Sequence, residues 1–206
     1  TVLGPMDVFF LAGRLWNIVY NQPMTPFFDV EIVSEKEGPV TCLNNLIIQP
    51  HRTIAQVRKT DLIIISSITN RERKPNFNPE TIRWLQRQHR LGASIASVCT
   101  GAFLLAATGL LDGKTATTHW GFMDLFRERY PNVLLKPEKL ITDEGTLYCA
   151  GALSAGIDLS IYLVEKYCGH EVAIQCSKAL MHDMGRQSQA PYSVLQFQKK
   201  IGRAHV

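Results

Sequence analysis

The chain has 206 residues, a formal net charge of +4 and 46% hydrophobic residues, which suits one large domain or two small ones around a real core. This hydrophobic content argues against intrinsic disorder, and the scattered basic residues argue against a dedicated nucleic-acid surface, which would be more basic and more clustered. The five cysteines are widely spaced and include no C-x-x-C pair, which argues against a disulfide framework and a zinc site. We therefore expect a cytoplasmic protein with no metal and no cofactor, without an export signal or a membrane span.

The first half of the chain predicts strands that alternate with helices. A sheet of this type ordinarily begins with a strand, and none precedes the first helical pattern, so we expect residues of a first strand to be missing before Thr1. The expected elements are a helix over 7–20, an alternating strand over 27–33, a short helix over 53–59, a continuously apolar strand over 61–66 and a helix opened by a proline over 79–90.

The second half continues this alternation and adds one hairpin. The expected elements are strands over 94–98 and 115–118, helices over 100–108, 120–130, 154–167 and 171–183, and a hairpin of strands 140–142 and 146–149. This order predicts an α/β fold, a flavodoxin-like parallel-sheet sandwich with helices on both faces, over residues 1–184. Residues 185–206 lack a helical face and are expected to form a polar tail or linker.

One cysteine stands where a buried strand meets a helix. The strand over 94–98 ends directly before Cys99, and the next helix begins at Thr100 and Gly101. A nucleophile at such a turn projects above the strand ends, and the amides of the two following residues point into the same space. These amides and the helix dipole favour a thiolate or a bound anion, so Cys99 is predicted to occupy a nucleophile elbow beside a small-molecule pocket. The remaining cysteines are predicted to pack as small hydrophobic side chains: Cys42, Cys149, Cys168 and Cys176.

A histidine follows the next predicted strand. His119 comes directly after the strand over 115–118, and neighbouring parallel strands end at one edge of a sheet, so its imidazole is a candidate to lie near the Cys99 thiol. A histidine followed by Trp120 is equally compatible with a structural role, and the spacing alone does not decide between the two.

The segment from Ser97 to Trp120, SVCTGAFLLAATGLLDGKTATTHW, carries a family resemblance. It resembles the PfpI-type superfamily, which has the class-I glutamine amidotransferase-like fold. Within that superfamily the chain is most similar to the N-terminal sensor domain of AraC-family transcriptional regulators, with isocyanide hydratases as near relatives. The motifs GPMDVF over 4–9, RYP over 129–131 and AGALSAGID over 150–158 agree with this resemblance.

The resemblance implies roles for five residues. Cys99 would be the reactive cysteine, and the amides of Thr100 and Gly101 would form an oxyanion-type site. His119 would lie beside that site, and Asp158, at the start of a core helix, would cap the helix or line the pocket.

One position departs from the hydratases. They place an aspartate three residues before the Gly-Pro motif as the acid/base beside the cysteine, and this chain has Thr1 there. A threonine hydroxyl cannot shuttle protons as a tuned carboxylate does, and the loss of general acid–base help costs about 10²–10⁴-fold in rate. The substitution favours a binding protein over a catalyst.

Three functions remain open at this point. The first is a ligand-sensing domain that binds a small nitrogenous metabolite and forms a homodimer, with DNA bound only through a C-terminal helix-turn-helix domain absent from this chain. The alternative is a cysteine-dependent hydrolase or hydratase that uses Cys99 as nucleophile and His119 as base or orienter. The third is a redox sensor in which Cys99 forms a sulfenic acid stabilised by the same amides.

Overall fold

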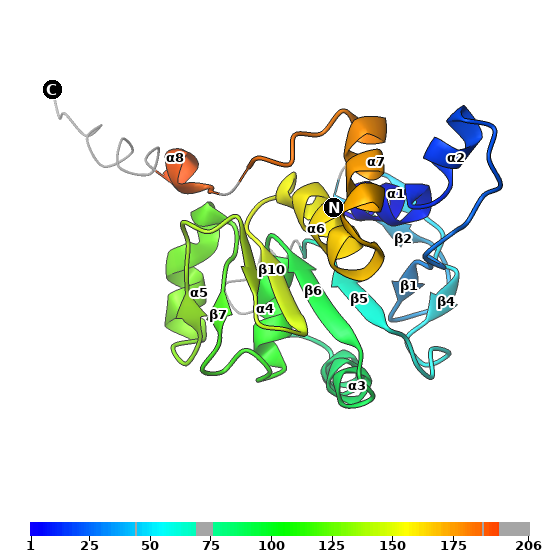
Figure 1. Cartoon of the computed structure of the whole chain (residues 1–206). Helices are drawn as coiled ribbons and strands as arrows, with labels where there is room; N and C mark the ends of the chain where they lie inside the picture. The colour runs from blue at the N-terminus through cyan, green and yellow to red at the C-terminus, as the bar shows by residue number, and fades with distance from the viewer. Residues whose placement is uncertain (44, 69–75, 187, 194–206) are drawn as a thin grey trace, which may run out of the picture.

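A four-stranded sheet lies at the centre of the computed structural model, which describes residues 1–43, 45–68, 76–186 and 188–193 (Figure 1). Its strand order is β5 (Leu62–Ile65), β6 (Ser94–Val98), β10 (Leu147–Ala150) and β9 (Ile141–Asp143). The first three strands are parallel, and β9 pairs antiparallel with β10, so the sheet is mixed. The two apolar strands and the hairpin predicted from the sequence are confirmed.

Helices cover both faces of this sheet. One face carries α1 (Leu3–Leu11), α6 (Ala155–Cys168) and α7 (His170–Leu180), and the other carries α3 (Pro79–Arg90), α4 (Gly101–Ala107) and α5 (Met123–Arg129) (Figure 1). The central strands contribute alternate residues to the two cores: Ile95 and Leu147 pack on the α4 side, whereas Ala96 and Tyr148 pack on the α6 side. Strands buried on both faces are typical of parallel α/β sheets, so the predicted layering is confirmed.

The prediction of one helix over 7–20 is wrong, because the structure has two. The first, α1, ends at Leu11, and α2 spans Leu15–Val19. Between them Gly13 has φ +73°, and a side chain there would collide with the carbonyl of Thr25. The Gly13 carbonyl accepts a hydrogen bond of 2.9 Å from the Thr25 N–H, so the returning chain takes the place of a continued helix.

Two further predictions between residues 27 and 59 are also wrong. The strand predicted over 27–33 is replaced by the two-residue β1 (Val33–Ser34), which pairs in parallel with β4 (Arg52–Thr53). No helix covers 53–59, a range that the structure describes fully. Instead the carbonyl of Val57 accepts hydrogen bonds from side chains of α3, among them Gln88 at 3.2 Å, so tertiary contacts fix this segment in a non-helical conformation.

The remaining elements are short. They are β2 (Val40–Thr41), β3 (Ile47–Ile48), β7 (Thr115–Ala116), β8 (Leu134–Leu135), the 3₁₀ helix η1 (Trp120–Phe122) and α8 (Ala190–Ser193). The strand predicted over 115–118 is thus two residues long, and the helix predicted over 120–130 begins as a 3₁₀ turn. The last core helix, α7, stops at Leu180 because Met181 is left-handed, with φ 51°.

The C-terminal region is described only in part. Ser188 forms an antiparallel bridge with Lys139, so residues of this region pack onto the domain. The rest of the predicted tail, residues 187 and 194–206, lies outside the described residues. None of the helices in the described ranges is long and apolar enough to cross a membrane.

Candidate functional site

Cys99 lies at a sharp turn between β6 and α4. Its φ is 58°, a left-handed conformation that is strained for a residue with a side chain. The Cys99 N–H donates to the carbonyl of Ala150 at 2.8 Å, and the Cys99 carbonyl accepts from the Thr118 hydroxyl at 3.0 Å. Neighbours on β10 and after β7 therefore hold the turn in place. The residue itself is buried, with 5% of its surface exposed.

The two residues after Cys99 attach the start of α4 to the end of β5. The Thr100 hydroxyl donates to the Ile68 carbonyl at 2.8 Å and accepts from the Ile68 N–H at 3.0 Å. A Cβ on Gly101 would lie 2.6 Å from the Ile65 carbonyl oxygen and 2.7 Å from that of Ser66. Gly101 thus allows a close approach between the start of α4 and the backbone at the end of β5.

Thr1 lies at the same edge of the sheet. Its hydroxyl accepts a hydrogen bond of 3.2 Å from the Ser67 N–H, and the Ser67 hydroxyl donates to the Val98 carbonyl at 3.5 Å. The side chain at the position of the hydratases' acid is therefore connected through one residue to the strand that carries Cys99.

His119 has the contacts of a structural residue. Its Nδ1 accepts from the Gly121 N–H at 3.1 Å and caps η1, so the ring proton is on Nε2 in the neutral form. The ring stacks on Trp120, with centroids 5.2 Å apart, and burial lowers the pKa of the imidazole. Among the described hydrogen bonds and ring contacts of His119, none involves Cys99. The two residues are connected through Thr118, which precedes the histidine.

Asp158 is the centre of a charged cluster. Its carboxylate lies in the first turn of α6, with 6% of the side chain exposed. One oxygen lies 3.0 Å from Nε2 of His182, and the other lies 3.4 Å from a terminal nitrogen of Arg186. The second terminal nitrogen of Arg186 donates to the Ser154 hydroxyl at 3.2 Å. The cluster therefore attaches the segment after α7 to the start of α6.

Gln189 extends this attachment, and sequence reasoning missed it. Its side chain packs against Gly151, where any larger residue would collide with the amide. Its Nε2 donates to the Thr117 hydroxyl and the Thr118 carbonyl, each at 3.0 Å, and to the Lys139 carbonyl at 3.2 Å. Only 1% of Gln189 is exposed. A buried glutamine in a polar, aperiodic stretch leaves no signal in a single sequence.

A cavity of about 180 Å³ lies where these groups meet, beyond the carboxyl end of β10. It is lined by Trp120, Leu140, Ala152, Ser154, Arg186 and Gln189. Parallel α/β sheets bind ligands at this edge. Cys99 is not among the lining residues, although it ends the neighbouring strand at the same edge.

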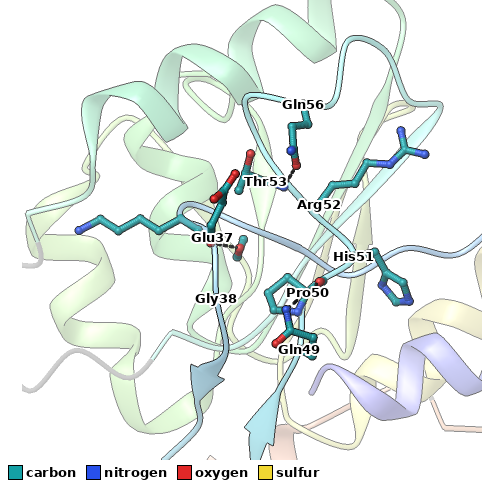
Figure 2. Close-up of a pocket in the computed structure, with 10 residues that line it drawn as sticks. Glu37, Gly38, Gln49, Pro50, His51, Arg52, Thr53 and Gln56 are labelled. Atoms are coloured by element: carbon teal, nitrogen blue, oxygen red, sulfur yellow. Dashed lines mark hydrogen bonds between the residues drawn. The ribbon is translucent and has the colours of Figure 1, made fainter.

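A second cavity of about 170 Å³ lies away from this edge, between residues 34–38 and 49–56 (Figure 2). Its groups bond to each other and to nearby backbone: the Thr53 N–H donates to Gln56 at 2.8 Å, and His51 accepts from the Ile32 N–H at 2.9 Å. Within the described ranges, no group of three or more His, Cys, Asp or Glu residues is arranged to hold a metal ion.

The other cysteines differ from Cys99 in their surroundings. Cys149 and Cys176 are buried in the two cores, and Cys42 and Cys168 are half-buried. Burial raises the pKa of the Cys149 and Cys168 thiols and that of Cys176 to about 11. These three cysteines remain protonated thiols near neutral pH.

The chain is similar to transcriptional regulators and to one hydratase. The HTH-type transcriptional regulator CdhR of Pseudomonas aeruginosa is 31% identical over 147 residues, which are 71% of this chain and 43% of CdhR, so the match spans less than half of the regulator. The isonitrile hydratase of Pseudomonas putida is 30% identical over 183 residues, which are 85% of this chain and 78% of the hydratase.

Solved structures share the fold. A putative transcriptional regulator from Vibrio parahaemolyticus superposes with a TM-score of 0.74 at 22% identity, over 87% of this chain and 91% of that one. An AraC family transcriptional regulator from Pseudomonas putida gives a TM-score of 0.71 at 21% identity, over 86% and 90% of the two chains. At these identities the superpositions show a shared fold. The family model described as the DJ-1/PfpI family matches residues 22–166, and the chain belongs to that family.

Proposed function

We propose that this domain is the ligand-sensing part of an AraC-type transcriptional regulator and binds a small nitrogenous metabolite near Cys99. The observation that carries the proposal is the similarity to CdhR, which includes 71% of this chain and 43% of the regulator, as expected for one domain of a longer protein. On this proposal the whole protein is a cytoplasmic homodimer that binds DNA through a C-terminal helix-turn-helix domain. A ligand would act by binding one state of the dimer or of the domain pair more tightly than the other.

The site supports binding over catalysis. The side chain at the hydratases' acid position is the hydroxyl of Thr1, which is hydrogen-bonded to Ser67. His119 uses Nδ1 to cap a turn and stacks on Trp120. We propose that the turn at Cys99 is a nucleophile elbow in geometry, with the amides of Thr100 and Gly101 available to a polar ligand rather than to a reaction intermediate.

Catalysis is the second candidate, because the isonitrile hydratase matches over 78% of its own length and Cys99 is held in a strained turn. In this reading Cys99 attacks the substrate and His119 is the base or the residue that orients it.

One experiment separates the two candidates. The purified chain and its Cys99→Ser variant are given isonitriles and small amides, and product is measured by mass spectrometry, while thermal denaturation is followed with a panel of small amines and amino acids. A saturable rise in melting temperature without any product supports the sensor. Turnover that disappears in Cys99→Ser, while Cys42→Ser retains it, supports the enzyme and overturns the sensor-only proposal.

A further inference from the structure

The outer face of α3 carries a row of arginines. Arg83, Arg87 and Arg90 are exposed and are spaced by four and three residues, so they lie on one side of the helix. At 1.5 Å per residue the row extends along roughly 10 Å of the helix axis. Figure 1 shows α3 at the lower edge of the molecule, and the inner side of the helix contributes Leu85 to the core. The row is therefore accessible to a partner along its whole length.

A neighbouring segment adds two more cations. Arg58 and Lys59 are exposed, and their backbone is attached to α3, because the Gln88 amide donates to the Arg58 carbonyl at 3.2 Å. The same segment fixes one arginine of the row, since Arg87 donates to the Val57 carbonyl at 3.2 Å. The fold thus gathers cations that are scattered along the sequence. We call these five residues the α3 basic face: Arg58, Lys59, Arg83, Arg87 and Arg90.

The charge of the α3 basic face is not neutralised by its surroundings. Among the described residues none of its five members takes part in an ion pair, whereas Arg52 and Arg186 are each paired with an acid. Residues 54–68 and 76–92 contain these five cations and two acids, Asp61 and Glu80, so they carry +3 (5 − 2) of the chain's net charge of +4. An excess of one sign on one surface attracts a partner of the opposite sign.

Helix stability explains only part of this pattern. Arg87 and Arg90 lie in the last turn, where the helix dipole favours cations. Arg83 lies a turn earlier, and Arg58 and Lys59 are outside the helix, so the dipole gives no reason for their positions. Each guanidinium presents a fork of donors that fits a carboxylate, so three arginines at helical spacing match a row of carboxylates.

The surroundings of the row favour an acidic polypeptide over nucleic acid. Acids stand at the start of α3, where Glu80 is exposed and Glu35 accepts from the Thr81 hydroxyl at 2.5 Å. These carboxylates repel a phosphate backbone, whereas a polypeptide can place a lysine or a neutral residue against them. Leu91, which is 48% exposed, follows Arg90 and offers an apolar contact that phosphates cannot use.

We propose that the α3 basic face docks an acidic helical segment of a partner protein, with carboxylates three and four residues apart opposite Arg83, Arg87 and Arg90. The occupant is a helix because the arginine row has the rise of a helix, and carboxylates at this spacing on a second helix have the same separation. The interaction goes beyond the proposed function, since it uses no residue of the Cys99 turn or of the cavity at the end of β10. Exposed ion pairs are individually weak and screened by salt, so binding depends on the whole row.

Fluorescence anisotropy of the whole chain with two labelled peptides tests the proposal. Both peptides are alanine-rich helices of equal length and glutamate content; one has its glutamates on a single face at the spacing of the arginines, and the other has them distributed around the helix. The first is expected to bind at least about fivefold more tightly, and salt is expected to weaken it at least about tenfold between about 50 mM and about 300 mM sodium chloride. Equal affinities contradict a helical row, and binding that salt does not change contradicts charge pairing. A duplex DNA that binds as tightly as the first peptide overturns the assignment to a polypeptide.

Variants locate the docking surface. The triple variant Arg83→Gln, Arg87→Gln, Arg90→Gln is expected to weaken peptide binding at least roughly tenfold, and replacement of the same three residues with Lys, which keeps the charge, is expected to restore most of it. The matched control replaces three exposed cations elsewhere with Gln: Arg127, Lys136 and Lys139. The control has the same net charge as the first variant, so equal weakening in both shows a diffuse effect of charge and overturns the site.

A measurement on the unmutated chain covers the case in which a variant does not fold. A carbodiimide condenses a peptide carboxylate with a nearby lysine amine to an amide and takes up the water as a urea. Mass spectrometry is expected to find the single-face peptide joined to Lys59 of the α3 basic face. Peptide joined to Lys136 or Lys178 with Lys59 unmodified overturns the placement. The sensor proposal is judged separately, because it depends on effector binding near Cys99.

Discussion

Replacing Gly101 with alanine is expected to disturb the Cys99 turn and to destabilise the domain. The new Cβ would lie 2.6 Å and 2.7 Å from two backbone carbonyl oxygens at the end of β5, whereas ordinary contacts begin at 3.4 Å. Relief therefore needs a movement of about 0.8 Å (3.4 − 2.6) by α4 or by the strand. The residues of α4 from Gly101 to Ala106 are buried in a packed core, so such a movement displaces many neighbours.

The magnitude follows from two opposing effects. Overpacking of this kind costs about 3 kcal/mol, and alanine gains about 1 kcal/mol over glycine in helix propensity, which leaves about 2 kcal/mol of net destabilisation. For a chain of this length that loss corresponds to a fall of roughly 4–8 °C in melting temperature. Differential scanning calorimetry measures the melting temperature, and the rate of Cys99 alkylation by iodoacetamide reports the change in the turn.

Gly4→Ala is the matched control. This glycine lies in α1, and the nearest atom to its new Cβ is the flexible Cγ1 of Ile157 at 3.1 Å, so the contact is relieved by a side-chain movement. The control is expected to melt within 2 °C of the parent or above it. A Gly101→Ala protein that melts within 1 °C of the parent and alkylates at the same rate would refute this account of the turn.

Three further predictions concern a buried glutamine, a half-buried histidine and two buried cysteines. Gln189→Ala removes the donor of three acceptors and is expected to lower the free energy of unfolding in urea by about 2 kcal/mol. The exposed Gln22→Ala is the control and is expected to cost under about 0.5 kcal/mol; equal losses would contradict the burial argument. Because the pKa of His119 is lowered in the folded state, its contribution to stability is complete above pH 6.5 and is lost as the pH falls through the folded pKa. Urea midpoints are therefore expected to fall less between pH 7.5 and 5 in His119→Gln than in the parent, and identical slopes would show that this histidine is not the group involved. Burial and raised pKa values are expected to keep Cys149 and Cys176 unmodified by iodoacetamide at pH 7.5 in the folded protein, and mass spectrometry that finds either one modified would contradict the described core.

The sheet and its covering helices could be predicted because their signals are local. The apolar runs over 61–66 and 94–98 became β5 and β6, and α3 begins at the proline after Asn78, whose side chain accepts from the Glu80 N–H at 2.9 Å. The region from residue 12 to residue 59 was mispredicted because its conformation depends on distant partners. The break at Gly13 exists because residue 25 returns to it, and the segment at Val57 is held by side chains of α3.

Some residues of the candidate site could be predicted from local sequence signals, and others could not. The hydrophobic periodicity predicted that Cys99 lies between a buried strand and a helix, and that the helix begins at Thr100 and Gly101. The roles of Arg186 and Gln189 could not be predicted, because they lie in a polar stretch after the last core helix. The burial of Gln189 and the position of Arg186 depend on contacts with Thr117, Thr118, Lys139, Gly151 and Ser154, which no local pattern in the sequence reveals.

The contacts of Gln189 have a mechanical consequence for the described C-terminal segment. Its amide bonds to the segment after β7 and to the loop before β9, so displacement of this one side chain breaks contacts with both. Displacement of Gln189 breaks its hydrogen bond to the Thr118 carbonyl, and the Thr118 hydroxyl is bonded to the Cys99 carbonyl. Gln189 thus couples the described C-terminal segment to the turn that carries Cys99.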